Sequence, residues 1–145
     1  MKPLSRLVTM ALCFVLLLPG VSLAAEVQSL IDDGIELCEQ GKYDQAINDF
    51  NQALKQKPKD AAILNCLGVA HYAKGQNDRA IQYFTEALKA NPKYTLAYMR
   101  RANVYDTMGE YDKALADLEQ AKNLGHKVYS DFFKLIERKR AAKRR

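Results

Sequence analysis

The chain has 145 residues, enough for one compact domain, and 27% of them are charged. Its mean hydropathy of −0.32 is typical of a soluble protein. The formal net charge of +5 is unevenly placed: residues 134–145 contain seven basic residues and one acidic residue, whereas residues 25–133 have a net charge of −3. The basic character therefore belongs to the C-terminal tail, and the rest of the chain lacks the charge of a nucleic-acid-binding domain.

Residues 1–25 have the pattern of an export signal. Two basic residues precede an apolar run from Leu7 to Leu18, and Ser22-Leu23-Ala24 offers the small residues of a cleavage site. The run is shorter than the roughly 20 residues that span a bilayer. We therefore expect cleavage after Ala24 or Ala25 and a periplasmic or secreted protein, with an uncleaved membrane anchor as the alternative.

Residues 27–128 contain a helix–turn–helix pattern that recurs every 34 residues. In the clearest copy, residues 61–94, the apolar spacing predicts two amphipathic helices, which Gly75 separates and Pro92 ends. Small residues are expected where the two helices of a hairpin cross closely, and large apolar residues between hairpins. The matching positions are Gly34, Gly68 and Ala102; Gly41, Gly75 and Gly109; Asp44, Asp78 and Asp112; Ala46, Ala80 and Ala114; Phe50, Phe84 and Leu118; and Ala53, Ala87 and Ala121.

This pattern resembles the tetratricopeptide repeat family, whose 34-residue signature is matched here by Leu67-Gly68, Ala80-x-x-x-Phe84 and Pro92. The resemblance implies an all-α solenoid of three helical hairpins, at residues 27–60, 61–94 and 95–128. The third repeat departs from the family at Arg101, where a leucine is usual. The family is a scaffold for many partners, so the resemblance predicts the fold more strongly than the function.

Residues 129–145 are predicted to form a capping helix, roughly Asp131 to Lys143, with a basic tail. A repeat array leaves its last apolar face uncovered, and a helix that is apolar early and charged late is suited to cover it. The residues expected to close the core are Val128, Phe132, Phe133, Leu135 and Ile136. Residues Arg140 to Arg145 are expected to fray.

The sequence contains no pattern of residues that predicts catalysis. His71 falls in a core-facing helical position and His126 in a turn, and neither has further ligands at the spacing of a metal site. We therefore expect no enzyme activity, no cofactor and no metal. Cys38 and Cys66 lie on the first helices of neighbouring repeats, and we expect two buried thiols, with a disulfide as the alternative.

The resemblance also implies a binding site in the concave groove that is lined by the first helix of each repeat. The residues that it places there are Ile31, Ile35, Asn65, Val69, Tyr72, Leu96, Met99, Arg100, Asn103 and Asp106, with Gln28 and Cys38 at the first repeat. A well-known groove chemistry of the family is a clamp of lysines, asparagines and an arginine for a partner's terminal carboxylate. Here Ile31, Ile35, Cys66 and Leu96 occupy most of the clamp positions, and only Arg100 matches.

We therefore expect a mixed apolar groove that binds a partner's amphipathic helix or apolar peptide. An alternative is that the N-terminal segment covers part of the apolar surface. The tail Arg138–Arg145 is interpreted first as a solvated helix end, then as a contact to an anionic membrane or polymer, and last as a nucleic-acid contact.

Taken together, these patterns predict a non-catalytic scaffold for protein–protein interaction outside the cytoplasm. The alternative is a surface-association protein whose basic tail holds anionic lipid or cell-wall polymer. The sequence predicts neither the identity of the partner nor the oligomeric state.

Overall fold

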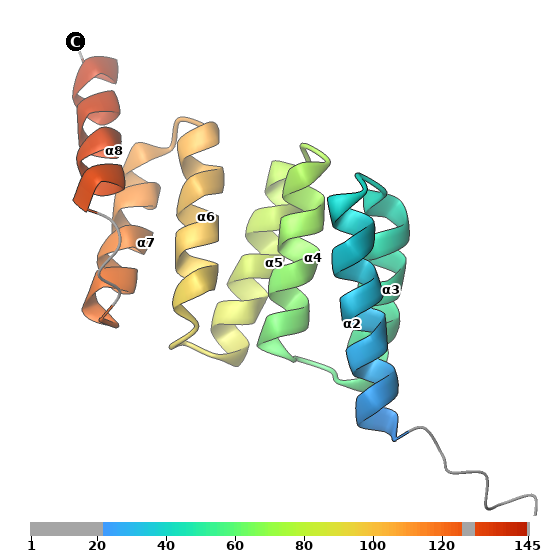
Figure 1. Cartoon of the computed structure of the whole chain (residues 1–145). Helices are drawn as coiled ribbons and strands as arrows, with labels where there is room; N and C mark the ends of the chain where they lie inside the picture. Colours follow the sequence, from blue (N-terminus) through green and yellow to red (C-terminus); the bar gives the residue numbers. More distant parts are fainter. Residues whose placement is uncertain (1–21, 126–129, 145) are drawn as a thin grey trace, which may run out of the picture.

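The computed structural model describes residues 22–125 and 130–144, and every regular element in these ranges is an α-helix. Three hairpins follow one another: α2 (Leu23–Glu39) with α3 (Tyr43–Gln56), α4 (Ala61–Ala73) with α5 (Asn77–Ala90), and α6 (Thr95–Thr107) with α7 (Tyr111–Asn123). A last helix, α8 (Ser130–Lys143), follows them (Figure 1). The predicted all-α solenoid with a C-terminal capping helix is confirmed.

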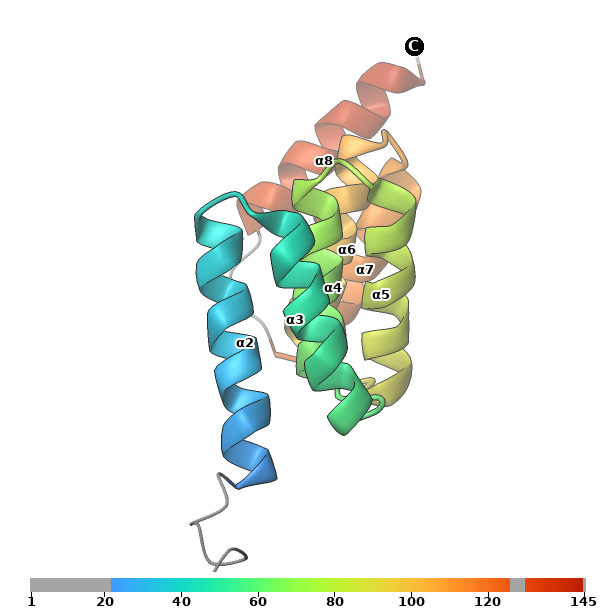
Figure 2. The ribbon, with the colours of Figure 1, turned by 90° about the vertical axis from the view of Figure 1, so that its right-hand side faces the viewer.

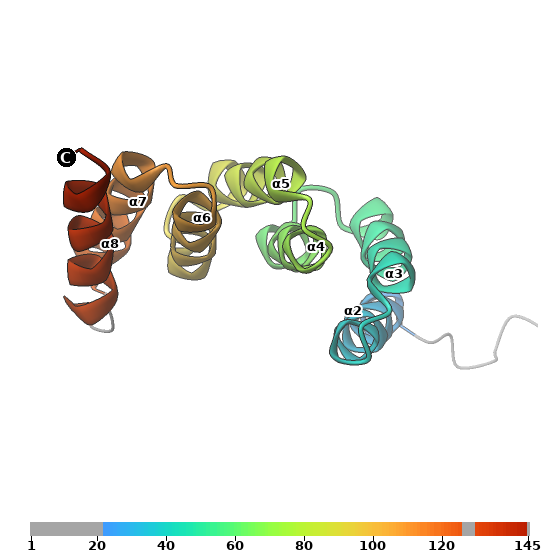
Figure 3. The same ribbon diagram turned by 90° about the horizontal axis from the view of Figure 1, so that it is seen from above.

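The hairpins stack into a curved array with two layers. The first helices α2, α4 and α6 lie along one side, and the second helices α3, α5 and α7 lie along the other (Figure 3). The curve places the first helices on the concave side, which we call the inner face. Helix α4 lies in the middle of this face and contacts both α2 and α6.

Within a hairpin, glycine lets the two helices approach closely. A Cβ atom added at Gly68 would lie 2.6 Å from Cε1 of Phe84, and one added at Gly34 would lie 2.6 Å from Cε1 of Phe50. Both phenylalanines are 1% exposed. The third repeat has Ala102 and Leu118 at the corresponding positions, so a larger residue on one helix is matched by a smaller one on the other. The 34-residue pattern therefore reflects the matched residue sizes that let the two helices of each hairpin pack closely.

The core is continuous along the array because each hairpin packs against the next. Val27, Phe50, Ile63 and Leu67 are buried together at the junction of the first two hairpins. Between the second and third hairpins, Leu64 and Leu88 are buried beside Ala97. The middle helix α4 is packed on several sides, and its buried residues are Ile63, Leu64, Asn65, Leu67, Gly68, Ala70 and His71.

Helix α8 covers the end of the third hairpin and is inclined to the helices of the array (Figure 2). Its Ile136 is fully buried among Ala102, Ala114, Leu115 and Leu118, and Phe132 and Phe133 pack at the edge of this cluster. Leu135 was expected in the same contact, but it is 45% exposed. The prediction for Leu135 is wrong because α8 packs against the hairpin with the side that carries Ile136, and Leu135 lies on a different side of the helix.

Helix α8 runs from Ser130 to Lys143, close to the predicted Asp131 to Lys143, and so includes the first part of the end that was expected to fray. Val128, His126 and Arg145 lie outside the described residues.

The predicted leader lies outside the described residues as far as residue 21. Helix α2 begins at Leu23, which is 61% exposed, and Val27 is its first buried residue. Cleavage after Ala24 or Ala25 would therefore remove only exposed residues from this helix. Within the described ranges, none of the helices has the length and apolar character needed to cross a membrane.

Candidate functional site on the inner face

Two of the predicted groove residues are exposed apolar side chains on the helices that flank α4. Ile35 on α2 is 43% exposed, and Leu96 on α6 is 41% exposed. Ile31, Val69 and Met99 are half-buried, and Arg100 and Asn103 are exposed. The two exposed apolar residues therefore lie on the helices on either side of α4.

Tyr72, another predicted groove residue, links α4 to α6 by a hydrogen bond. Its Oη lies 2.8 Å from Oγ1 of Thr107 on α6. Because the Thr107 hydroxyl donates its hydrogen to the Asn103 carbonyl at 3.0 Å, the Tyr72 hydroxyl is the donor in this pair. Tyr72 is therefore half-buried and engaged, so its role includes fixing the spacing of α4 and α6.

Asn65 was expected to be an exposed amide, but it is only 4% exposed. Its Oδ1 is buried, and no described residue donates a hydrogen bond to it. Buried acceptors are usually satisfied, so an unpaired one is a feature that needs an explanation. The sequence pattern placed Asn65 on a first helix but did not reveal its burial, because α4 is packed on several sides.

Cys38 and Cys66 are both free thiols that pack against the core of the first junction. The structure has two free thiols rather than a disulfide, and both are half-buried where burial was expected. Burial raises the pKa of the Cys38 thiol. Burial also raises the pKa of Cys66, where the charge of Arg100 acts in the opposite direction and the charges of Cys38 and Asp60 add to the rise. Both thiols are neutral near pH 7, which suits an apolar lining.

Asp106, the last predicted groove residue, is held by the capping helix. The ammonium of Lys139 donates to both of its carboxylate oxygens, at 2.9 Å to Oδ1 and 2.8 Å to Oδ2. The side chain of Asp106 is 11% exposed. Helix α8 therefore neutralises this end of the inner face, and Asp106 is not a free acceptor for a partner.

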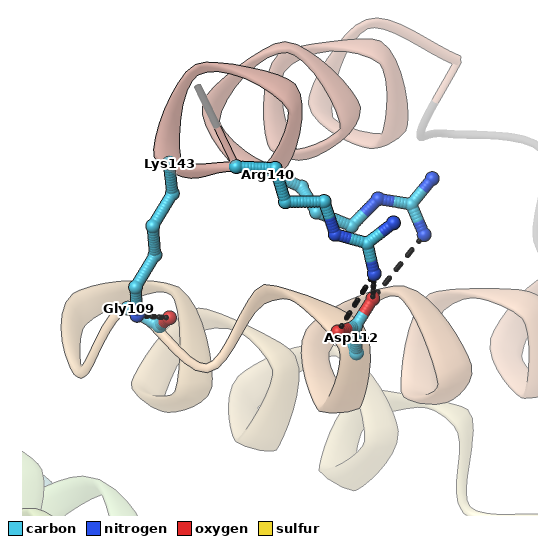
Figure 4. Close-up of polar contacts among 5 residues, drawn as sticks. Gly109, Asp112, Arg140 and Lys143 are labelled. Carbon is cyan, nitrogen blue, oxygen red and sulfur yellow. Dashed lines mark hydrogen bonds and ion pairs between the residues drawn. The ribbon is translucent and has the colours of Figure 1, made fainter.

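Three further cations, in α8 or directly after it, also contact the third hairpin. Lys143 donates to the Gly109 carbonyl at 2.8 Å, and Arg140 and Arg144 each lie 3.3 Å from the Asp112 carboxylate (Figure 4). A hollow of about 460 Å³ lies between this end of α8 and the turn from α6 to α7. Another hollow, of about 520 Å³, lies away from the inner face and is lined by Leu54, Pro58, Lys59, Leu64, Glu86, Lys89 and Ala90.

Arg101 forms a polar network that the sequence pattern did not predict. Its guanidinium donates to Oδ2 and Oδ1 of Asp117 at 2.8 and 2.7 Å, and to Oγ1 of Thr85 at 2.8 Å. The hydrogen bond to Asp117 raises the pKa of Arg101 although burial opposes the rise. The sequence showed that Arg101 stands where the family usually has leucine, but it did not show that Asp117 and Thr85 are the partners of Arg101.

His71 is a core residue, as predicted. It is 3% exposed, stacks on Tyr83 with ring centroids 5.1 Å apart, and has its Nδ1 2.6 Å from Oε1 of Gln76. Since an amide oxygen only accepts, Nδ1–H is the donor. The described residues contain no group of histidine, cysteine and carboxylate side chains that could hold a metal ion.

Comparison with known proteins gives matches to family models and to solved structures. Two models of the tetratricopeptide repeat match residues 32–95 and 71–136, which together run from the first repeat into α8. No curated protein matches the chain by sequence.

Three solved structures illustrate the similarity of the fold. The first is the first TPR of Spaghetti (RPAP3) bound to the HSP90 peptide SRMEEVD, with 22% identity and a TM-score of 0.75, covering 80% of this chain and 94% of that chain. The second is the Sgt2 TPR domain from Aspergillus fumigatus, with 25% identity and a TM-score of 0.73, covering 82% and 80%. The third is the type III secretion translocator chaperone SycD from Yersinia enterocolitica, with 20% identity and a TM-score of 0.72, covering 90% and 94%.

Proposed function

The chain belongs to the tetratricopeptide repeat family, and we propose that it is a non-catalytic scaffold that binds a partner protein on its inner face. The observation that carries this proposal is the exposure of Ile35 and Leu96, at 43% and 41%, on the two helices that flank α4. Large apolar side chains on one rigid concave surface provide the contact area that association requires. His71 is buried and Asp106 is paired with Lys139, so neither is an exposed acid or base on this surface.

Similar structures support a peptide as the bound element. The RPAP3 domain is described as bound to an HSP90 peptide. In this chain Ile31, Ile35, Cys66 and Leu96 occupy positions where the family's carboxylate clamp has polar residues. The proposed partner segment is therefore held by apolar contact rather than by its terminal carboxylate.

We also propose that the protein works outside the cytoplasm. The basis is the sequence of residues 1–25, in which two basic residues, an apolar run and a small-residue cleavage site follow one another. Measuring the intact mass of the protein from a cell fraction outside the cytoplasm tests this proposal. A mass that starts after Ala24 or Ala25 supports export with cleavage, and a chain that retains Met1 there supports an anchor.

Binding of the tail to anionic lipid or cell-wall polymer is the second candidate. The observation that favours it is the cluster of cations on α8, in which the Arg144 side chain is 66% exposed. Against it, Lys139, Arg140, Lys143 and Arg144 all contact the third hairpin. A surface would have to compete with these contacts, so we rank this role below partner binding.

The test compares two exposed leucines. Leu96→Glu places a charge on the inner face, whereas Leu124→Glu places one at the end of α7, where the leucine is 39% exposed. Each variant is used to capture crosslinked partners from intact cells, followed by identification of the proteins. We expect Leu96→Glu to lose the partner and Leu124→Glu to retain it. Retention by both variants, with loss on neutralising Arg140 and Arg144, would favour the tail instead.

A further inference from the structure

The first helix of the array is strongly acidic. Helix α2 carries Glu26, Asp32, Asp33, Glu36 and Glu39 and no lysine or arginine. Within the part of the chain that the structure describes, none of these carboxylates forms an ion pair. Asp32 and Glu36 accept hydrogen bonds only from the neutral amides of Gln28 and Gln40, at 2.9 and 3.0 Å. Asp106 on α6, whose side chain is 11% exposed, is by contrast neutralised by Lys139.

Part of this acidic surface borders the exposed isoleucine of the inner face. Asp32 lies three residues before Ile35 and Glu39 lies four residues after it, so both share its side of the helix. Glu36 lies next to Ile35 in sequence, and all three carboxylates are exposed. The apolar surface therefore has an acidic border along α2.

One predicted groove residue on α4 lies beneath the surface. Oδ1 of Asn65 on α4 is buried without a hydrogen-bond donor among the described residues. Because this oxygen is covered by the array itself, a partner on the surface does not reach it, and it has no part in selecting the occupant. The acidic border is the feature that favours an occupant that carries cations.

The polar groups of this surface also favour a helix over an extended peptide. An extended backbone needs hydrogen-bond partners for its N–H and C=O groups. Among the predicted groove residues with polar side chains, Asn65 is buried, Tyr72 is bonded to Thr107 and Asp106 is paired with Lys139. Only Arg100 and Asn103, both on α6, remain exposed. A helix satisfies its own backbone and presents side chains to an apolar surface.

We propose that the inner face binds a cationic amphipathic helix, whose apolar stripe lies on Ile35, Val69 and Leu96 and whose lysines or arginines lie along Asp32, Glu36 and Glu39 of α2. This proposal rests on the function proposed above and specifies the chemistry of the partner. It predicts a partner of opposite charge to the acidic SRMEEVD peptide that the RPAP3 domain binds.

The test uses two synthetic helices of about four turns as probes, one a Leu/Lys amphipathic peptide and the other its Leu/Glu counterpart. Binding to the purified protein is measured by fluorescence anisotropy. The acid variant combines Asp32→Asn, Glu36→Gln and Glu39→Gln. A matched control, Glu26→Gln with Asp33→Asn and Asp78→Asn, removes the same charge from exposed positions that do not border Ile35. A third variant, Ile35→Ser with Leu96→Ser, removes the apolar contact.

We expect the Leu/Lys helix to bind wild type, with a Kd about tenfold higher for the acid variant and changed less than about twofold by the control. The Leu/Glu helix should bind at least about tenfold more weakly, and the preference should shrink in about 0.5 M salt. Circular dichroism checks that each variant is folded.

Equal binding of both helices that is lost only in the Ile35→Ser and Leu96→Ser variant would overturn the preference for cations and leave the proposed binding face intact. Binding of neither helix, or binding unchanged by that variant, would count against the inner face itself and so against both proposals.

Discussion

At the scale of single residues, the third repeat replaces apolar packing with a buried ionic contact. Arg101 and Asp117 have side chains that are 16% and 7% exposed, and the guanidinium also reaches Thr85 in the preceding hairpin. Thr85 in turn donates to the Ile81 carbonyl at 2.7 Å. A charged pair that is desolvated in this way depends on both partners, because either one alone would be a buried, uncompensated charge.

Asp117→Ala should therefore lower the free energy of unfolding by about 3–5 kcal/mol, since it leaves the Arg101 charge buried without its partner. The double variant Arg101→Leu with Asp117→Ala should be more stable than Asp117→Ala, because it removes the unpaired charge as well. Urea unfolding followed by circular dichroism measures both. A double variant that is less stable than Asp117→Ala would contradict this view of the pair.

The two half-buried thiols predict a dependence of stability on pH. Burial raises the pKa values of Cys38 and Cys66 in the folded state. A raised pKa means that the folded state favours the neutral thiol. The stability that the neutral thiols contribute is fully present below the ordinary thiol pKa, and it is lost as the pH rises through the pKa of the folded state. From about pH 8 to about pH 10 the urea midpoint of wild type should fall more than that of Cys38→Ala with Cys66→Ala. Parallel pH profiles would show that the thiols do not contribute.

At the scale of elements, the contact of Gly68 with Phe84 sets the distance between α4 and α5. An alanine Cβ at position 68 would lie within 3.0 Å of three ring carbons of Phe84. Glycine is an unfavourable residue in a helix by about 1 kcal/mol relative to alanine, so its presence in α4 is explained by packing rather than by helix propensity.

Gly68→Ala should lower stability by about 1–3 kcal/mol, because overpacking outweighs the gain in helix propensity. Combining it with Phe84→Leu reproduces the Ala102 and Leu118 pair of the third repeat. A double-mutant cycle should show that the two changes compensate each other by about 1 kcal/mol. Strictly additive effects would mean that the two residues do not constrain one another.

The capping helix provides a matched pair of variants. Ile136→Ala should cost about 2–4 kcal/mol, because Ile136 is fully buried against the third hairpin and its truncation leaves a cavity. Leu135→Ala, one residue earlier and 45% exposed, should change stability by less than about 1 kcal/mol. Thermal unfolding measures both, and the whole array should respond because a short repeat array unfolds cooperatively. Equal effects of the two variants would show that α8 packs differently.

At the scale of the whole molecule, the repeated hairpins could be predicted from the sequence. The side-chain contacts between one hairpin and its neighbours could not. The 34-residue spacing of Gly75 and Phe84 from their copies predicted the three hairpins. The apolar start and charged end of residues 129–145 predicted the capping helix. The ion-pair partner of Lys139 depends on the angle at which α8 lies across the third hairpin. The 34-residue repeat pattern carries no information about this angle. Likewise Asn65 lies on the predicted helix, but its burial follows from packing by neighbouring hairpins on several sides of α4.

The central claim is that the partner binds to the inner face rather than to the outer helices or the tail. Photo-crosslinking from single positions tests it most directly, with a photoreactive amino acid placed at Ile35 or Leu96 on the inner face, at Gln52 or Ala116 on the exposed side of the second helices, or at Arg144. All five positions are exposed, so the fold should tolerate each one. We predict that the same partner protein is crosslinked from Ile35 and Leu96 and not from the other three positions. Crosslinks from Gln52, Ala116 or Arg144 without crosslinks from Ile35 and Leu96 would contradict the claim.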